Sequence, residues 1–84
     1  MCSYITEKTA IFGSAKGADG WSSVASAHVY YDHPYHAALD HALSIDFLSP
    51  DSERKIAVEL SAESARALVA SILAALESGQ DAHG

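Results

Sequence analysis

The sequence predicts an α+β domain, in which a four-stranded antiparallel meander sheet is followed by one C-terminal helix packed on one sheet face. Two observations lead to this prediction: extended segments separated by glycine and proline clusters, and a helical spacing of apolar residues that begins after Ser61. The chain has 84 residues, which is enough for one domain only. We expect this domain at 1–78 and a flexible polar tail at 79–84.

Four segments have the composition of strands, being rich in β-branched and aromatic residues or alternating between apolar and polar side chains. They are 3–12, 21–32, 43–48 and 55–60. A glycine-rich stretch at 13–20 is expected to be a hairpin loop, and Pro34 ends the second strand because proline lacks the amide donor.

Alternation assigns faces within these strands. In the second strand it places His28, Tyr30 and Asp32 on one face and Val29, Tyr31 and His33 on the other. In the third strand it predicts that Leu43, Ile45 and Phe47 face a core while Ser44 and Asp46 face outward.

The last segment reads as a helix that starts at Ser61 and stops near Gly79. The Ser61 side chain is suited to cap the first amides, and Glu63 lies near the positive end of the helix dipole. Apolar residues recur on one face with helical spacing. They are Ala62, Ala65, Leu68, Val69, Ile72, Leu73 and Leu76.

Charge and composition exclude several classes of function. The net charge is −6, and the five Lys and Arg residues are scattered, which argues against nucleic-acid binding. The longest helical apolar stretch, 65–76, is shorter than the roughly 20 residues of a membrane span. The N-terminus lacks the pattern of a secretory signal, and the single Cys2 rules out an internal disulfide, so we expect a cytoplasmic protein.

Histidines are crowded in the middle of the chain. Four of them fall within fourteen residues, namely His28, His33, His36 and His41. Neutral imidazole is a common ligand of Zn, Cu, Ni and Fe, so a site with three protein ligands is one interpretation. The spacing matches no standard zinc motif, however, and the same residues can be solvated or hydrogen-bonded to Asp32 and Asp40.

Cys2 has two chemical interpretations and one structural one. Removal of Met1 would put an amine and a thiol on one residue, which could chelate a transition metal together with His28, His33, His36 or His41. Alternatively, Cys2 acts as a nucleophile with His33 or His36 as the base. The structural interpretation is a small apolar residue at a frayed terminus.

Carboxylates on the predicted strands are less specific. Asp46 and Glu59 share the outward face of neighbouring strands and could form an acid–base pair, although charged residues on a solvated face are the ordinary expectation. Asp32 is suited to orient a neighbouring imidazole.

One helix covers one face of a sheet, so aromatic residues such as Phe12, Trp21 and Tyr31 need another cover. We therefore predict a homodimer, and we expect a small-molecule pocket built from the region 28–41 at or near its interface.

The chain resembles an uncharacterised family of short actinobacterial proteins. The likeness extends to about Leu76 and rests on the N-terminal Met-Cys-Ser-Tyr, on the glycine-rich stretch before Trp21 and on Asp-His-Pro-x-His at 32–36. It implies that Cys2 and the histidine motif belong to the family pattern, and no activity comes with it.

Three functions remain open from the sequence. The first is transition-metal binding, with or without metal-assisted chemistry on a small molecule, through Cys2 and the histidines. The second is a metal-free enzyme that uses Cys2 and a histidine base. The third is a non-catalytic interaction module in which the histidines are structural.

Overall fold

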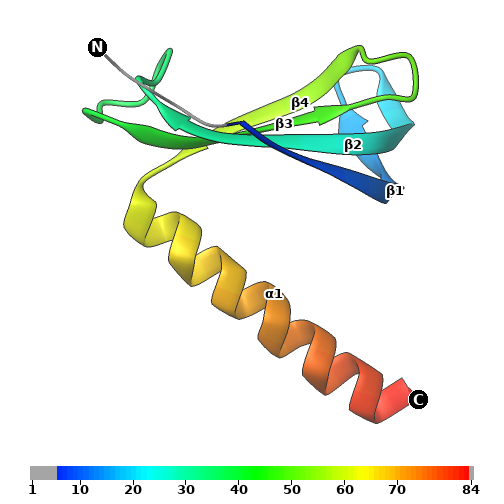
Figure 1. Cartoon of the computed structure of the whole chain (residues 1–84). Helices are drawn as coiled ribbons and strands as arrows, with labels where there is room; N and C mark the ends of the chain where they lie inside the picture. Colours follow the sequence, from blue (N-terminus) through cyan, green and yellow to red (C-terminus); the bar gives the residue numbers. More distant parts are fainter. Residues whose placement is uncertain (1–5, 84) are drawn as a thin grey trace.

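The computed structural model describes residues 6–83. It contains β1 (Glu7–Gly17), β2 (Gly20–Asp32), β3 (Ala42–Leu48), β4 (Arg54–Leu60) and α1 (Ala62–His83). The strands form one antiparallel sheet in the order β1-β2-β3-β4, with the helix after the last strand (Figure 1). The predicted meander sheet and C-terminal helix are therefore confirmed.

The hairpin between β1 and β2 is longer and tighter than expected. The stretch 13–20 was predicted to be a loop, but β1 continues to Gly17 and β2 begins at Gly20, so this prediction is wrong. Gly20 has a φ of 102°, a conformation that favours glycine and allows the two-residue turn. An irregularity between Ala10 and Gly13 shifts the register of β1 against β2.

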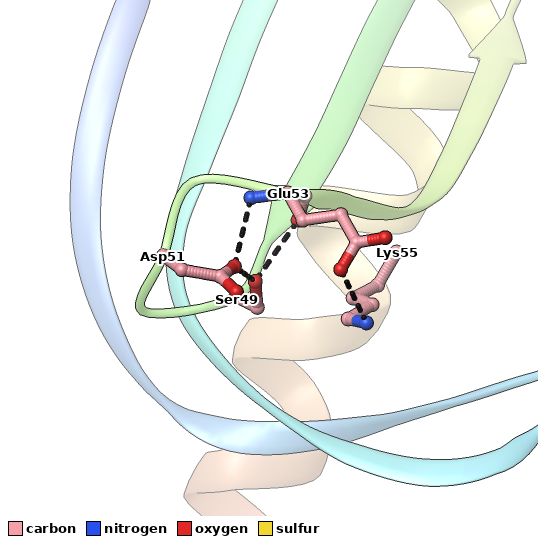
Figure 2. Close-up of polar contacts among 4 residues, drawn as sticks. All are labelled: Ser49, Asp51, Glu53 and Lys55. Carbon is pink, nitrogen blue, oxygen red and sulfur yellow. Dashed lines mark hydrogen bonds and ion pairs between the residues drawn. The ribbon is translucent and has the colours of Figure 1, made fainter.

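The turn between β3 and β4 is held by a compact set of side-chain hydrogen bonds (Figure 2). The Ser49 hydroxyl donates to the Asp51 carboxylate and contacts the Glu53 carbonyl oxygen at 3.2 Å, while the Glu53 amide donates to Asp51 at 3.1 Å. These bonds, the one from Ser49 first, lower the pKa of Asp51. Lys55 pairs with Glu53 at 3.0 Å, and Ser52 takes a left-handed φ of 71°.

Cross-strand pairing gives the sheet two different faces. We call the face toward α1 the apolar face; it carries Val29, Leu43, Ile45, Phe47, Ile56, Val58 and Leu60. We call the opposite side the polar face; it carries Lys8, His28, Tyr30, Asp32, Ser44, Asp46 and Glu59. The alternation of His28, Tyr30 and Asp32 against Val29 and Tyr31 follows the prediction. His33, which was predicted on the face of Val29 and Tyr31, instead lies beyond the end of β2 and lines a cavity together with His28 and Tyr30.

Burial on β3 is the reverse of the expectation. Ser44 and Asp46 are buried, with exposed fractions of 5% and 8%, whereas Leu43, Ile45 and Phe47 are only half-buried. The two sets do lie on opposite faces as predicted, but the expected burial of the apolar set and exposure of the polar set is wrong. The physical reason is that the connection between β2 and β3 folds against the polar face, while α1 leaves much of the apolar face uncovered.

The helix begins as predicted and ends later. The Ser64 amide donates to the Ser61 hydroxyl at 3.1 Å, which is an N-cap bond. The helix continues through Gly79 to His83, so the predicted end near Gly79 is wrong. A glycine inside a helix costs about 1 kcal/mol, which is too little to stop it. In the described part of the chain, no helix combines the length and apolar character needed to cross a membrane.

The helix does not lie flat on the sheet. Figure 1 shows it running diagonally away from the sheet after its first turns. Large apolar side chains of α1 therefore remain exposed, from 43% at Leu68 to 61% at Leu73. Among residues 6–83, the buried hydrophobic residues are only Val24, Ala27 and Ala42. The predicted packing of the helix across one face is thus limited to its N-terminal part, and the core of a single chain is small.

Candidate functional site

The polar face assembles its side chains in two rows that run across the strands. In one row, Lys8 of β1 pairs with His28 of β2, which pairs in turn with Asp46 of β3. In the next row, Tyr30 pairs with Ser44, and Ser44 pairs with Glu59 of β4. Because directly opposite residues of antiparallel strands share a face, the side chains of each row are neighbours.

Asp46 lies at the centre of this surface and is almost fully buried. The Tyr30 hydroxyl donates to its carboxylate at 3.3 Å, and a guanidinium nitrogen of Arg54 lies 3.5 Å away. Burial is the first cause that raises the pKa of Tyr30, followed by the charge of Asp46. The phenol therefore keeps its proton at neutral pH and stays a hydrogen-bond donor to Asp46.

Glu59 fastens the connection between β2 and β3 onto the polar face. Its carboxylate accepts three consecutive backbone amides, from Tyr35 at 2.5 Å and from His36 and Ala37 at 3.0 Å each. These bonds, led by the one from Tyr35, lower the pKa of Glu59. The carboxylate is thus held in its charged form, and the connection gains a fixed position over the sheet.

Two adjoining cavities hollow the polar face, with volumes of about 470 Å³ and 320 Å³. Tyr30, Tyr35 and Asp46 line both of them, so the cavities are neighbours, and we call the two together the polar groove. Its other chemically active lining residues are Lys8, His28, Asp32, His33, His36, Ser44, Arg54 and Glu59.

The hydrogen-bonding balance of the polar groove favours a ligand with acceptor atoms. The carboxylates of Asp32, Asp46 and Glu59 already accept bonds from within the chain. Arg54 has five donor groups and a side chain that is 61% exposed, and Lys8 forms no ion pair within residues 6–83. The donors that remain in the groove include the cationic groups of Arg54 and Lys8, which can bind a carboxylate or phosphate group.

Two of the four central histidines lie together at the end of the sheet. The rings of His33 and His41 stack with centroids 4.7 Å apart, and His41 also stacks on Tyr31 at 5.5 Å. His33 Nδ1 lies 3.1 Å from the carbonyl oxygen of Asp40. Both imidazole rings are thus held by contacts within the chain. This agrees with the interpretation, one of those left open by the sequence, that these two histidines are structural.

The other two histidines lie in different parts of the polar groove. His28 lines one cavity together with His33, and His36 lines the other. Within residues 6–83, no three His, Cys, Asp or Glu residues are grouped so as to hold a metal ion. Cys2 lies outside the described residues. A transition-metal site and a Cys2 nucleophile therefore stay predictions, which elemental analysis of untagged protein and thiol labelling would test.

The predicted roles of the carboxylates are only partly reproduced. Asp32 binds the backbone amide of His33 at 2.8 Å, which is a contact with the main chain and not with an imidazole ring. Asp46 and Glu59 do share a face, but each is engaged by its own partners. The sequence interpretation missed Tyr30 and Arg54. The signal for Tyr30 was present in the alternation of β2, which placed it beside His28.

Comparison with known proteins gives a family without an activity. The chain belongs to a family of unknown function (DUF6295), whose model matches residues 1–84. This confirms the predicted membership of an uncharacterised family. No curated protein and no solved structure matches the chain.

Proposed function

We propose that this member of the family binds a small polar molecule with a carboxylate or phosphate group in the polar groove. The observation that carries the proposal is the buried Asp46, held between Tyr30 and Arg54 in that groove. Arg54 binds the anionic group, Asp46 accepts a hydroxyl or amine of the ligand, and Lys8 supplies a second cation in the adjoining cavity. Cavities of about 300–1,000 Å³ are typical of small-molecule sites, and both parts of the groove fall in that range.

The energetic cost of Asp46 supports a functional role. A buried charge loses hydration free energy that its partners regain only in part, and an apolar residue of similar size is often equally stable or more stable there. Asp46 lies between Ser44 and Leu48 in a strand that could carry apolar residues on both faces. The position of Asp46 on the wall of both cavities of the groove therefore supports a role in binding.

A thermal-shift titration tests the proposal directly. The probes are inorganic phosphate, citrate, glucose 6-phosphate, AMP and a neutral control, glucose. A ligand present at about a hundred times its Kd stabilises the native state by about 2.7 kcal/mol. For a domain of this size, we expect an increase in Tm of about 10 °C with at least one anionic probe and none with glucose.

Matched variants separate binding from folding. Asp46→Leu should fold with a Tm equal to or above that of the wild type, while Arg54→Gln and Asp46→Leu should both lose the ligand-induced shift. Lys16→Gln removes an exposed cation of β1 outside the groove and should keep the shift. The proposal is wrong if no anionic probe at 10 mM raises Tm by more than about 1 °C, or if the Arg54 and Lys16 variants respond alike.

A further inference from the structure

The middle of α1 lacks the charged face that exposed helices have. From Ala67 to Leu76 the sequence contains no charged residue, and all ten positions are exposed in the single chain. Leu68, Val69, Ile72, Leu73 and Leu76 are each more than 40% exposed. A helix that is apolar on nearly all sides is normally buried, so this segment requires a cover on more than one side.

The sheet leaves an open apolar space beside the same helix. A cavity of about 290 Å³ lies between α1 and the apolar face. We call this cavity the wedge. It is lined from the helix by Leu68, Val69 and Ile72 and from the sheet by Leu43 and Ile45, among others. Since no large side chain in residues 6–83 is fully buried, the missing core of this protein lies along the wedge.

We propose that a second copy of this chain fills the wedge, with the two α1 helices packed antiparallel across a two-fold axis. Each helix then covers the apolar face of its partner's sheet as well as the partner's helix. The axis passes between Ser71 and Ile72, and the helices lie between the two sheets. This surface is separate from the polar groove, so the inference does not depend on the proposed function.

The charges at the ends of the apolar segment fit this arrangement. Arg66 precedes the segment and Glu77 follows it, so the midpoint of the pair coincides with the midpoint of 67–76. The two residues are eleven positions apart, which is close to three helical turns, and therefore lie on the same flank of the helix. In an antiparallel pair, the same flank of each helix meets that of its partner. Arg66 of each chain then faces the partner's Glu77, which gives two such contacts in the dimer.

The area needed by a stable dimer explains why the sheets must take part. A 22-residue helix is about 33 Å long and about 10 Å wide, so helix pairing alone covers only about 330 Å² per chain. A standard interface needs about 800 Å² per partner. The half-buried apolar face supplies the remaining area, which is why each helix has to enter the wedge and not merely touch the other helix.

A lipid surface is a poorer occupant than a second copy. The chain has a net charge of −6, and within Ala62–His83 the only cationic side chain is Arg66, against Glu63, Glu77 and Asp81. Helices that lie on membranes usually carry several Lys or Arg residues, because the cytoplasmic leaflet is negatively charged. A two-fold dimer instead uses the charges that are present.

The first measurement is the molecular mass in solution, by light scattering and sedimentation equilibrium. We expect twice the chain mass of 8.9 kDa at micromolar concentration. Ile72→Glu places a carboxylate beside its own symmetry mate and should give a monomer. Ser78→Glu, just beyond the apolar segment, is the matched control and should remain a dimer. Circular dichroism of both variants checks that the helix and sheet are retained.

The second measurement is a charge exchange that reports the direction of the helices. Arg66→Glu and Glu77→Arg should each weaken dimerisation, raising its Kd about tenfold, because each creates two like-charged contacts. The double variant restores opposite charges and should return Kd to within about threefold of the wild type.

Three results would overturn the proposal. A wild-type monomer at 100 µM means that the wedge is not filled by a second copy, and binding of that monomer to phosphatidylcholine–phosphatidylserine vesicles would assign the helix to a lipid surface instead. A dimer that survives Ile72→Glu uses another interface. A double charge variant that is weaker than both single variants excludes the antiparallel pairing.

Discussion

The polar and apolar faces of the same four-stranded sheet differ in how far a single chain completes them. On the polar face, Asp46 and Glu59 have hydrogen-bond donors, and every buried side-chain nitrogen or oxygen atom within residues 6–83 has a partner. On the apolar face, Leu43 and Ile45 stay half-buried while α1, which faces them, diverges from the sheet (Figure 1). The polar side chains are therefore satisfied within one chain, whereas the apolar side chains of the other face remain partly exposed to solvent in one chain.

This difference bears on how the protein is built. Hydrophobic burial is the main favourable term in folding, yet here the side chains that would provide it are more exposed than the polar ones beside them. A domain of this length buries only about 60% of its unfolded surface even when well packed. If a second chain covers the apolar face, as proposed, substitutions on that face alter stability while the polar groove, which is formed within one chain, stays unchanged.

The largest expected effect tests the apolar face. Ile45→Ala should lower the free energy of unfolding by about 3 kcal/mol per chain if the face is covered in solution, and by only about 1 kcal/mol if Ile45 stays half-exposed. Urea unfolding at two protein concentrations measures this. Leu39→Ala, in the exposed connection, is the control and should cost less than about 0.5 kcal/mol. A loss near 1 kcal/mol would contradict a covered apolar face.

The next effect tests the polar face. Tyr30→Phe removes the hydroxyl that donates to Asp46 and should destabilise the protein by about 1 to 1.5 kcal/mol, since a buried carboxylate loses a donor. Tyr35→Phe is the control, because the Tyr35 side chain is 93% exposed. Equal Tm values for the two variants would show that the bond to Asp46 contributes nothing to stability.

A pH titration examines the attachment of the connection to β4. The pKa of Glu59 is lower in the folded state than in the unfolded chain. The stability that its carboxylate contributes is therefore fully present above the ordinary carboxyl pKa, and it is lost as the pH falls through the pKa of the folded state. The wild type should therefore lose its stability advantage over Glu59→Gln below about pH 4. Amide exchange at 35–37 should accelerate in the variant at pH 7, but not in Glu7→Gln. Unchanged exchange would contradict the anchoring role.

The smallest effect concerns the turn between β3 and β4. Ser52 has a positive φ without being glycine, so Ser52→Gly should relieve backbone strain and raise stability by about 0.5 kcal/mol. Ser52→Ala keeps the Cβ atom and should not stabilise the protein. Chemical denaturation of both variants provides the comparison, and a stabilised alanine variant would point to the hydroxyl instead of the backbone.

The sequence was sufficient for the sheet order and for the assignment of faces. Alternation of Val29 against Tyr30, or of Ile45 against Asp46, follows directly from strand geometry and requires no tertiary information. The N-cap at Ser61 was equally local. Strand alternation and the helix start were therefore predicted from neighbouring residues, whereas the glycine-rich stretch 13–20 was wrongly predicted to be a loop.

Burial and the candidate site depended on long-range contacts. From the sequence, Asp46 was expected to be solvated, because none of its neighbours in the chain indicates that Tyr30 and Arg54 enclose it. The attachment of 35–37 to Glu59 spans more than twenty residues and has no sequence signature. The late end of α1 was missed for a different reason, because Gly79 weakens a helix without ending it.

The three consecutive amides that donate to Glu59 form an anion-binding site, and the Glu59 carboxylate of the same chain occupies it. A carboxylate tethered by the fold acts at an effective concentration of millimolar or more, so dilute free anions compete poorly for these amides. If the groove binds an anionic molecule as proposed, the occupied amides leave the cationic side chains of the groove, and not the backbone of the connection, as its partners. An internal carboxylate can thus sharpen the selectivity of a site without touching the ligand.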